Sequence, residues 1–167
     1  MSATIRTASW ADLPAILAIY NDAVLHTTAS YDLEPVSMAQ RALWLASHEE
    51  RGDPVIVAEL GGSVVGFGAY GPFQAKLGYR FTVENSVYVA TEWRGHGIGR
   101  QLLVPLIAHA RAAGMHAMIA KIDAENPVSL HLHASCGFIE VGRFSQVGYK
   151  FDRWLDMVCM QLLLQAG

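Results

Sequence analysis

The chain has 167 residues, of which 52% are apolar and 16% are charged, and its formal net charge is −3. This length and apolar content suit one domain, residues 1–167, with a single sizeable core. Its twelve Lys and Arg residues are scattered and form no basic stripe, which argues against nucleic acid as a partner.

The hydrophobic periodicity and the turn residues predict an alternation of helices and strands. Capping boxes at Ser9–Asp12 and Ser37–Gln40 mark two helix starts, and Gly61-Gly62 marks a hairpin turn. The expected elements, in chain order, are a strand at 3–7, a helix from Ser9 to about Val24, a loop at 26–36, a helix from Ser37, strands at 55–60, 63–70 and 80–89, a helix at 97–113, a strand at 115–122, a helix from Pro127 to about Gly137, and strands at 138–144 and 154–164. Together they describe an α/β domain.

The cysteines and the N-terminus bear on the cellular setting. Cys136 and Cys159 are far apart and outside any C-x-x-C pair, so neither a disulfide framework nor a zinc site is indicated. The first residues lack the apolar segment of a signal peptide, and no apolar run approaches the ~18 residues of a membrane span. We therefore expect a cytoplasmic protein without a metal and without a membrane partner.

The most informative segment is a glycine-rich loop between a β-rich run and a helix. Val87-Tyr88-Val89 is followed, after four residues, by Arg94-Gly95-His96-Gly97-Ile98-Gly99-Arg100. Alternating glycines let a backbone approach a ligand, and the free N–H groups at a helix start favour a phosphate. A dinucleotide fingerprint would need glycine at Arg100, and the Gly-Lys-Ser/Thr of a P-loop is absent. The segment therefore predicts a pyrophosphate site of another kind.

Two motifs together resemble a known superfamily. Arg-x-x-Gly-x-Gly after a Val-Tyr-Val strand, matched by Arg94, Gly97 and Gly99, resembles the acetyl-CoA signature of the GNAT superfamily of N-acetyltransferases. Asn126-Pro127-Val128-Ser129 followed by Cys136-Gly137-Phe138 resembles its cofactor-flanking helix. The resemblance narrows to the phosphinothricin and methionine sulfoximine/methionine sulfone acetyltransferase group through Ala69–Phe73, Tyr79, Thr82, Glu84, Ser86–Val89, His133, Trp154 and Asp156.

The resemblance implies a fold, an activity and a cofactor site. The implied GNAT fold is a mixed, mostly antiparallel sheet flanked by helices and splayed at the acetyl-CoA site. The implied activity is acetyl-CoA-dependent acetylation, without a metal, of the α-amino group of small L-amino-acid analogues: methionine sulfone, methionine sulfoximine and phosphinothricin. The cofactor-binding residues are then expected to be Val87, Tyr88, Val89, Arg94, Gly95, His96, Gly97, Ile98, Gly99, Arg100, Asn126 and Ser129.

Catalytic candidates follow from the strand 80–89 and from the resemblance. Alternation places Arg80, Glu84 and Ser86 on one strand face, which is too polar for a core. Glu84 could be only an ion-paired strand residue, but the resemblance favours it as the base that takes the proton of the attacking amine. His133, which could equally be a core histidine, and Asn126 are both candidates for protonating the leaving thiolate, and the sequence does not choose between them.

The expected acceptor site lies around the same strand. Arg80 or Lys76 would hold a carboxylate or an oxo group, and aromatic and aliphatic side chains would enclose the short stem. The substrate-binding residues are expected to be Phe73, Lys76, Leu77, Gly78, Tyr79, Arg80, Glu84 and Ser86.

Other functions stay open at this point. A regulatory acetyl-CoA-binding module would keep the glycine loop but discard the base, and the presence of Glu84 argues against it. Acetylation of protein N-termini or of ribosomal proteins would need a more open groove than the loops 26–36 and 71–79 suggest, and another small amine remains an alternative acceptor. A homodimer is expected from the resemblance and from the apolar strand Met157–Leu164, which would be an exposed edge in a monomer.

Overall fold

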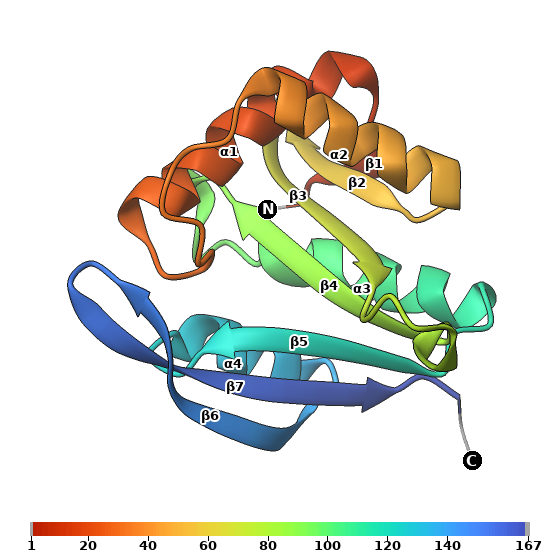
Figure 1. Ribbon diagram of the computed structural model, residues 1–167. Coiled ribbons are helices and arrows are strands. Elements are labelled where there is room, and N and C mark those ends of the chain that lie inside the picture. Colours follow the sequence, from red (N-terminus) through yellow and green to blue (C-terminus); the bar gives the residue numbers. More distant parts are fainter. Residues whose placement is uncertain (1, 166–167) are drawn as a thin grey trace.

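The computed structural model describes residues 2–165 and shows a seven-stranded sheet with helices on both faces (Figure 1). The strands are β1 (Thr4–Thr7), β2 (Val55–Leu60), β3 (Ser63–Pro72), β4 (Thr82–Val89), β5 (Ala117–Asp123), β6 (Ile139–Lys150) and β7 (Arg153–Leu163). The helices are α1 (Leu13–His26), α2 (Met38–Arg51), α3 (Ile98–Ala112) and α4 (Pro127–Ser135). The α/β class and the expected order of elements are confirmed.

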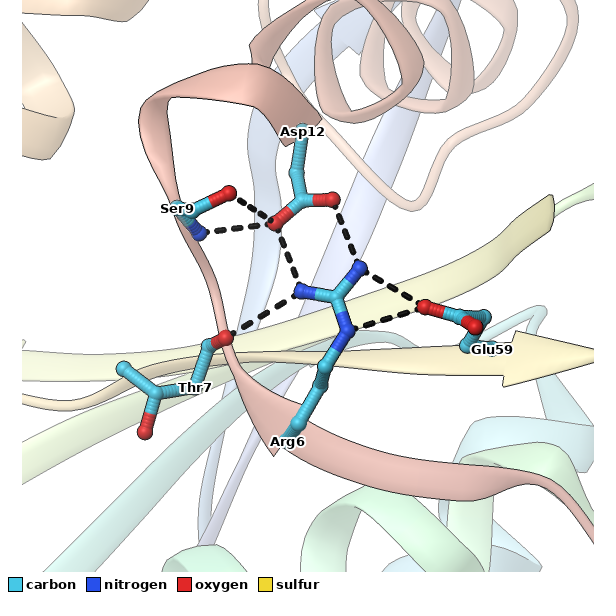
Figure 2. Close-up of polar contacts among 5 residues, drawn as sticks. All are labelled: Arg6, Thr7, Ser9, Asp12 and Glu59. Atoms are coloured by element: carbon cyan, nitrogen blue, oxygen red, sulfur yellow. Dashed lines mark hydrogen bonds and ion pairs between the residues drawn. The ribbon is translucent and has the colours of Figure 1, made fainter. Parts of the chain in front are cut away.

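The start of α1 is fixed by a charged cluster (Figure 2). Arg6 on β1 donates from Nη1 and Nη2 to the two carboxylate oxygens of Asp12 at 2.8 and 2.9 Å, and from Nε to Glu59 at 2.9 Å. The Ser9 backbone N–H donates to Asp12 Oδ2 at 2.7 Å, as the capping box predicts. The hydrogen bonds from Arg6 lower the pKa of Asp12 to about 2. This cluster ties β1, β2 and α1 together.

The sheet is antiparallel except at one place. Its strand order is β1-β2-β3-β4-β5-β7-β6, and only β4 and β5 run parallel. Their pairing is short and ends with Glu84 opposite Ile119, after which the two strands diverge toward their C-terminal ends (Figure 1). The expected splay is therefore present, and it begins directly after Glu84.

The helices divide the core into two layers. α1 and α2 cover one face of β2 to β4 around Ile16, Leu45 and Phe67. α3 covers the opposite face, and α4 joins it beneath β5 and β7, where Leu103 and Met118 share one apolar cluster. Successive residues of β4 consequently face different surroundings.

Several strand boundaries differ from the sequence expectation, including the start of β4 and the end of β6. β4 begins at Thr82, because Leu77–Tyr79 forms a 3-10 turn and Arg80 continues it with helical dihedral angles. β6 runs on to Lys150 through an irregularity after Phe144, and its hairpin turn uses left-handed dihedral angles at residues 151 and 152. The alternation argument for β4 therefore does not extend to Arg80.

The position of β7 corrects one further expectation. β7 pairs with β5 on one side and with β6 on the other, so the apolar strand near the C-terminus is interior to the sheet. The edge strand on that side is β6, because the β6–β7 hairpin places β7 next to β5 and β6 beyond it.

Candidate active site

The divergence of β4 and β5 leaves part of β4 without a strand neighbour. The Ala90 N–H donates to Val65 O, and the Phe73 N–H donates to Thr82 O, so even-numbered residues of β4 direct their backbone groups at β3. By alternation, Val87 and Val89 direct theirs toward β5, beyond the last paired position. Such an edge can accept an extended ligand as an added strand would be accepted.

The glycine loop lies at the end of this open edge. Gly95 and Gly97 have φ values of +79° and +78°, which favour glycine, and a Cβ on either would meet no atom within 4 Å. Gly97 is the N-cap residue of α3, and no side chain caps that helix start. Its first N–H groups are therefore placed to hold an anion.

Gly99 and Arg100 have a different position from the two preceding glycines. A Cβ on Gly99 would lie 3.0 Å from Leu132, so this glycine allows α3 to pack against α4. Arg100 Nη1 donates to the Ser135 carbonyl oxygen and to Ser135 Oγ, both at 3.1 Å. Both residues hold the two helices together.

Arg94 and His96 surround the loop at its exposed side. Arg94 Nε donates to the Val89 carbonyl oxygen at 3.1 Å, and its guanidinium lies 3.6 Å from Asp22 of α1. His96 Nδ1 lies 2.9 Å from the Arg94 carbonyl oxygen. These contacts fix the loop between β4 and α1.

Glu84 projects from the last paired position of β4 on the α1–α2 side of the sheet. Its carboxylate lies 2.9 Å from Lys121 Nζ of β5, and that ammonium lies 5.4 Å from the centre of the Phe73 ring. About 31% of the Glu84 side chain is exposed, so the carboxylate reaches solvent while paired. Ser86, the next residue on the same face, is exposed. This arrangement suits proton transfer from a small amine.

His133 lies on the opposite side of the sheet and does not join Glu84. It is 4% exposed, and its Nε2 lies 3.1 Å from Asn85 Oδ1 while its Nδ1 lies 2.9 Å from the Ser129 carbonyl oxygen. Asn85 Nδ2 in turn donates to the Ile119 carbonyl oxygen at 3.3 Å. Burial lowers the pKa of His133, which favours the neutral ring. The histidine thus links α4 to the point where β4 and β5 separate.

Asn126 and Ser129 form the start of α4. Asn126 Oδ1 accepts the Ser129 backbone N–H at 3.1 Å, which is an ordinary N-cap contact. Ser129 Oγ lies 3.4 Å from His133 Nδ1. The two residues therefore position α4 beside the divergence of β4 and β5.

The loop from Phe73 to Arg80 is mostly exposed. The rings of Phe73 and Tyr79 pack edge to face at 5.7 Å, while Leu77 is 80% exposed, and Lys76 and Gly78 are also exposed. Arg80 Nη1 donates to the Leu77 carbonyl oxygen at 3.2 Å. Phe73 is brought near Glu84 through their shared neighbour Lys121.

The segment between α1 and α2 is held against the far half of the sheet. Thr28 Oγ1 donates to the buried carboxylate of Asp123, and the buried Lys150 Nζ donates to the Ser30 carbonyl oxygen at 2.7 Å. A Cβ on Gly148 would overlap the Tyr31 ring. The segment therefore bridges the two halves of the sheet on the side of Glu84.

Two charged residues on the Glu84 side of the sheet were missed by the sequence reasoning. Lys121 is the one exposed residue in the otherwise buried strand β5, and a lone charge in an apolar run is a readable signal. Arg41 shares the buried face of α2 with Leu45 and His48 at i, i+4 and i+7 spacing, a signal of the same kind. Neither residue belongs to the motifs that carry the resemblance.

Two findings concern metals and membranes. Within residues 2–165, His, Cys, Asp and Glu side chains form no group of three or more that could hold a metal ion. No helix in the described part of the chain is long and apolar enough to cross a bilayer.

Known proteins resemble this chain over nearly its whole length. An L-methionine sulfoximine/L-methionine sulfone acetyltransferase of Pseudomonas aeruginosa is 50% identical over 165 residues, which cover 98% of this chain and 96% of that protein. The crystal structure of a ribosomal-protein-alanine N-acetyltransferase from Brucella melitensis has 51% identity and a TM-score of 0.94, covering 96% of this chain and 99% of the other.

A third protein was crystallised with acetyl-CoA. It is a GNAT superfamily phosphinothricin acetyltransferase from Sinorhizobium meliloti, with a TM-score of 0.97 and 40% identity over 100% of this chain and 91% of that chain. The model of the acetyltransferase (GNAT) family matches residues 15–138. The sheet that separates after Glu84, the glycine loop and these matches agree, and the chain belongs to the GNAT family of acetyltransferases.

Proposed function

We propose that this chain transfers the acetyl group of acetyl-CoA to the α-amino group of small L-amino-acid analogues, namely methionine sulfone, methionine sulfoximine and phosphinothricin. The observation that carries the proposal is the end of the β4–β5 pairing at Glu84. From this point along the chain come the carboxylate of Glu84, the open strand edge at Val87–Val89 and the start of α3 at Gly97, which no side chain caps. The names of the Pseudomonas and Sinorhizobium relatives supply the acceptors.

The residues around the open edge fit acetyl-CoA. Amide groups of its pantetheine arm would pair with the backbone of Val87 and Val89, and its pyrophosphate would meet the N–H groups near Gly95 and Gly97. When bound, acetyl-CoA supplies an acetyl group already activated as a thioester. Arg94, His96, Ile98, Gly99 and Arg100 would shape this site by fixing the loop and α3.

Glu84 carries the acid–base role in this proposal. It accepts a proton from the amine of the acceptor, directly or through a water molecule, because it is the carboxylate at the point of divergence. The Val89 N–H, which is directed at the gap between β4 and β5, would stabilise negative charge on the carbonyl oxygen under attack. The positions of His133 and Asn126 favour structural roles for both, as the sealed link to Asn85 and the N-cap of α4.

The tethered segment 27–37 supports a small acceptor. Its contacts to Asp123, Gly148 and Lys150 close the acceptor side across both halves of the sheet. A peptide would need an open groove at this place. The name of the Brucella relative nevertheless makes an N-terminal alanine the second candidate acceptor.

We also propose a homodimer in the cytoplasm. Apolar side chains are more than half exposed along the edge strand β6 and its turn, and burying them against a second copy would remove this surface from water. They are Ile139, Val141, Phe144, Val147, Tyr149 and Phe151. Light scattering at micromolar concentration checks the dimer, which a monomeric mass would disprove, and cell fractionation checks the location.

A comparison of acceptors tests the proposed function. Thiol release from acetyl-CoA would be followed with methionine sulfone, methionine sulfoximine, phosphinothricin, methionine and a short peptide that begins with alanine. We expect kcat/KM for methionine to fall by orders of magnitude below that for the sulfone, since donors that fit the oxo groups would be left unpaired. Equal turnover of methionine or of the peptide would refute the acceptor assignment, and thiol release with the peptide alone would favour the second candidate.

A further inference from the structure

Arg41 is a buried cation with an unused donor. It is 6% exposed, and its guanidinium lies between two rings, 4.0 Å from the centre of Tyr20 and 4.6 Å from that of Trp44. Its Nε is buried and has no hydrogen-bond partner, and no ion pair joins Arg41 to another of the residues 2–165. Stacking on rings holds the plane of the guanidinium but leaves its edge available for an anion.

The energetics of this environment favour an incoming negative charge. A buried charge without a counter-ion is costly, and burial lowers the pKa of Arg41, although the neighbouring Tyr20 acts in the opposite direction. Asp32 is the nearby carboxylate, but it is exposed and accepts the hydroxyl hydrogen of Tyr20. The Nε–H of the guanidinium is thus left for a group that the described chain does not supply.

A cavity of about 300 Å³ lies in front of this cation. It is lined by Tyr20, Asp32, Val36, Gln40, Arg41, Trp44, Phe67, Ser86 and Tyr88. Ser86 connects the cavity to the candidate base, because Glu84 and Ser86 lie on the same face of β4 at neighbouring positions about 7 Å apart. An acceptor whose amine faces Glu84 therefore has its adjacent atoms beside Ser86 and the cavity.

We propose that Arg41 binds the α-carboxylate of the acceptor amino acid in this cavity, an inference that rests on the proposed function. The α-carboxylate is attached to the same carbon as the reacting amine, so it stays close to Glu84 whatever side chain the acceptor carries. The planar fork of arginine matches a carboxylate with two parallel hydrogen bonds. The buried Nε of Arg41 is available for one of them.

The same observations explain why Arg80 and Lys76 are weaker candidates for this role. Both are exposed, and Arg80 lies outside β4, stacks on Phe81 at 4.5 Å and donates to Leu77 O. An exposed cation on a surface loop binds a carboxylate weakly, because water competes with it. They can still contact the variable side chain of the acceptor.

The test compares two acceptors that differ only in the carboxylate. Methionine sulfone and its carboxylate-free analogue 3-(methylsulfonyl)propylamine would be assayed with wild type, Arg41→Lys and Arg41→Gln. We expect Arg41→Gln to lower kcat/KM for methionine sulfone by about 100-fold, mainly through KM, as the loss of charge-assisted hydrogen bonds implies. The analogue should be turned over slowly by all three proteins, with little difference among them. Arg41→Lys, which keeps the charge but loses the fork, should lie between wild type and Arg41→Gln.

The controls separate binding from folding. Arg51→Gln removes a positive charge from the far end of the same helix and should leave both acceptors unaffected. Far-ultraviolet circular dichroism and acetyl-CoA affinity by calorimetry would show whether Arg41→Gln is folded, and added guanidinium should partly restore its turnover of methionine sulfone.

A second readout does not depend on activity. The Nε–H resonance of Arg41 in wild type should shift on titration with methionine sulfone and stay unchanged with the carboxylate-free analogue. Equal losses for the two acceptors in Arg41→Gln, or an unmoved resonance, would overturn the carboxylate assignment. A wild type that acetylates no amino-acid analogue would instead overturn the proposed function.

Discussion

The two faces of strand β4 carry polar residues that differ in solvent exposure and in hydrogen-bond partners. On one face Glu84 is about one-third exposed and paired with Lys121, and Ser86 opens into a cavity. On the other face Asn85 is 7% exposed, its Nδ2 donates to the Ile119 carbonyl oxygen, and its Oδ1 contacts His133 Nε2. Neighbouring residues of one strand thus differ in environment, since the Glu84 face is open while the Asn85 face is sealed and links β4 to β5 and α4.

The difference has an energetic basis. A buried polar group must find a partner, and removing that partner costs about 1–3 kcal/mol of stability. A partly exposed carboxylate can exchange its partner for water or for a substrate at much lower cost. A proton acceptor in catalysis must be able to exchange its partner, as a partly exposed carboxylate can. A buried, fully paired group instead fixes the positions of the strands that it links.

Glu84→Gln gives the largest expected effect and tests the open face. The amide keeps the shape of the side chain but cannot accept the proton, so we expect kcat to fall by roughly 10²–10⁴-fold while acetyl-CoA affinity stays unchanged. Steady-state kinetics between pH 6 and 9 and calorimetry measure the two quantities. Lys121→Met is the matched variant for the ion pair and should change kcat far less. Near-normal turnover of Glu84→Gln would remove Glu84 from the mechanism.

Asn85→Ala tests the sealed face. The substitution leaves the Ile119 carbonyl oxygen and His133 Nε2 without their partner, and we expect the free energy of unfolding to drop by roughly 1–3 kcal/mol. Denaturant titration measures this change, and Ser86→Ala, one position along, should have little effect. A folded Asn85→Ala protein should lose much less activity than Glu84→Gln. An equal loss of kcat would show that both faces take part in the chemistry.

The smallest expected effect concerns pH. Burial lowers the pKa of His133, and also that of His48, so the folded state disfavours the charged rings. The unfolded chain takes up these protons below about pH 6.5, and stability should therefore fall as the pH drops from about 7 toward 5 and stay level above that range. His133→Gln should make this slope shallower, with His48 supplying the remainder. An unchanged slope in denaturant titrations at several pH values would contradict the sealed, neutral position of His133.

The glycine loop was predictable because it is one continuous segment. Gly95, Gly97 and the start of α3 are neighbours in sequence, and both glycines have positive φ angles that favour glycine. Gly99 shows the limit of that reasoning. A third glycine in the same pattern lies against Leu132, and only the packing of α3 on α4 reveals it.

The acceptor side was less predictable because distant segments form it. Arg41 of α2 and Ser86 of β4 line one cavity, and Lys121 of β5 pairs with Glu84. No local sequence pattern predicts these contacts. Arg80 was assigned to β4 by extending the alternation across a 3-10 turn, which the sequence does not mark clearly. The interior position of β7 was also missed. β7 is interior because β6 continues past Phe144 and pairs along it, and the irregular register of β6 hides this pairing from a reading of residue alternation.

The segment between α1 and α2 has a consequence for how acceptors are distinguished. Thr28, Ser30 and Tyr31 are fixed against Asp123, Lys150 and Gly148 by contacts within the chain. The conformational entropy of ordering this segment is therefore lost when the chain folds, and acceptor binding does not have to supply it again. Preorganisation of this kind also means that an acceptor of the wrong shape gains little from rearrangement of the segment. Discrimination among amino acids would then rest on a segment that the chain's own contacts hold in place, with little contribution from induced fit.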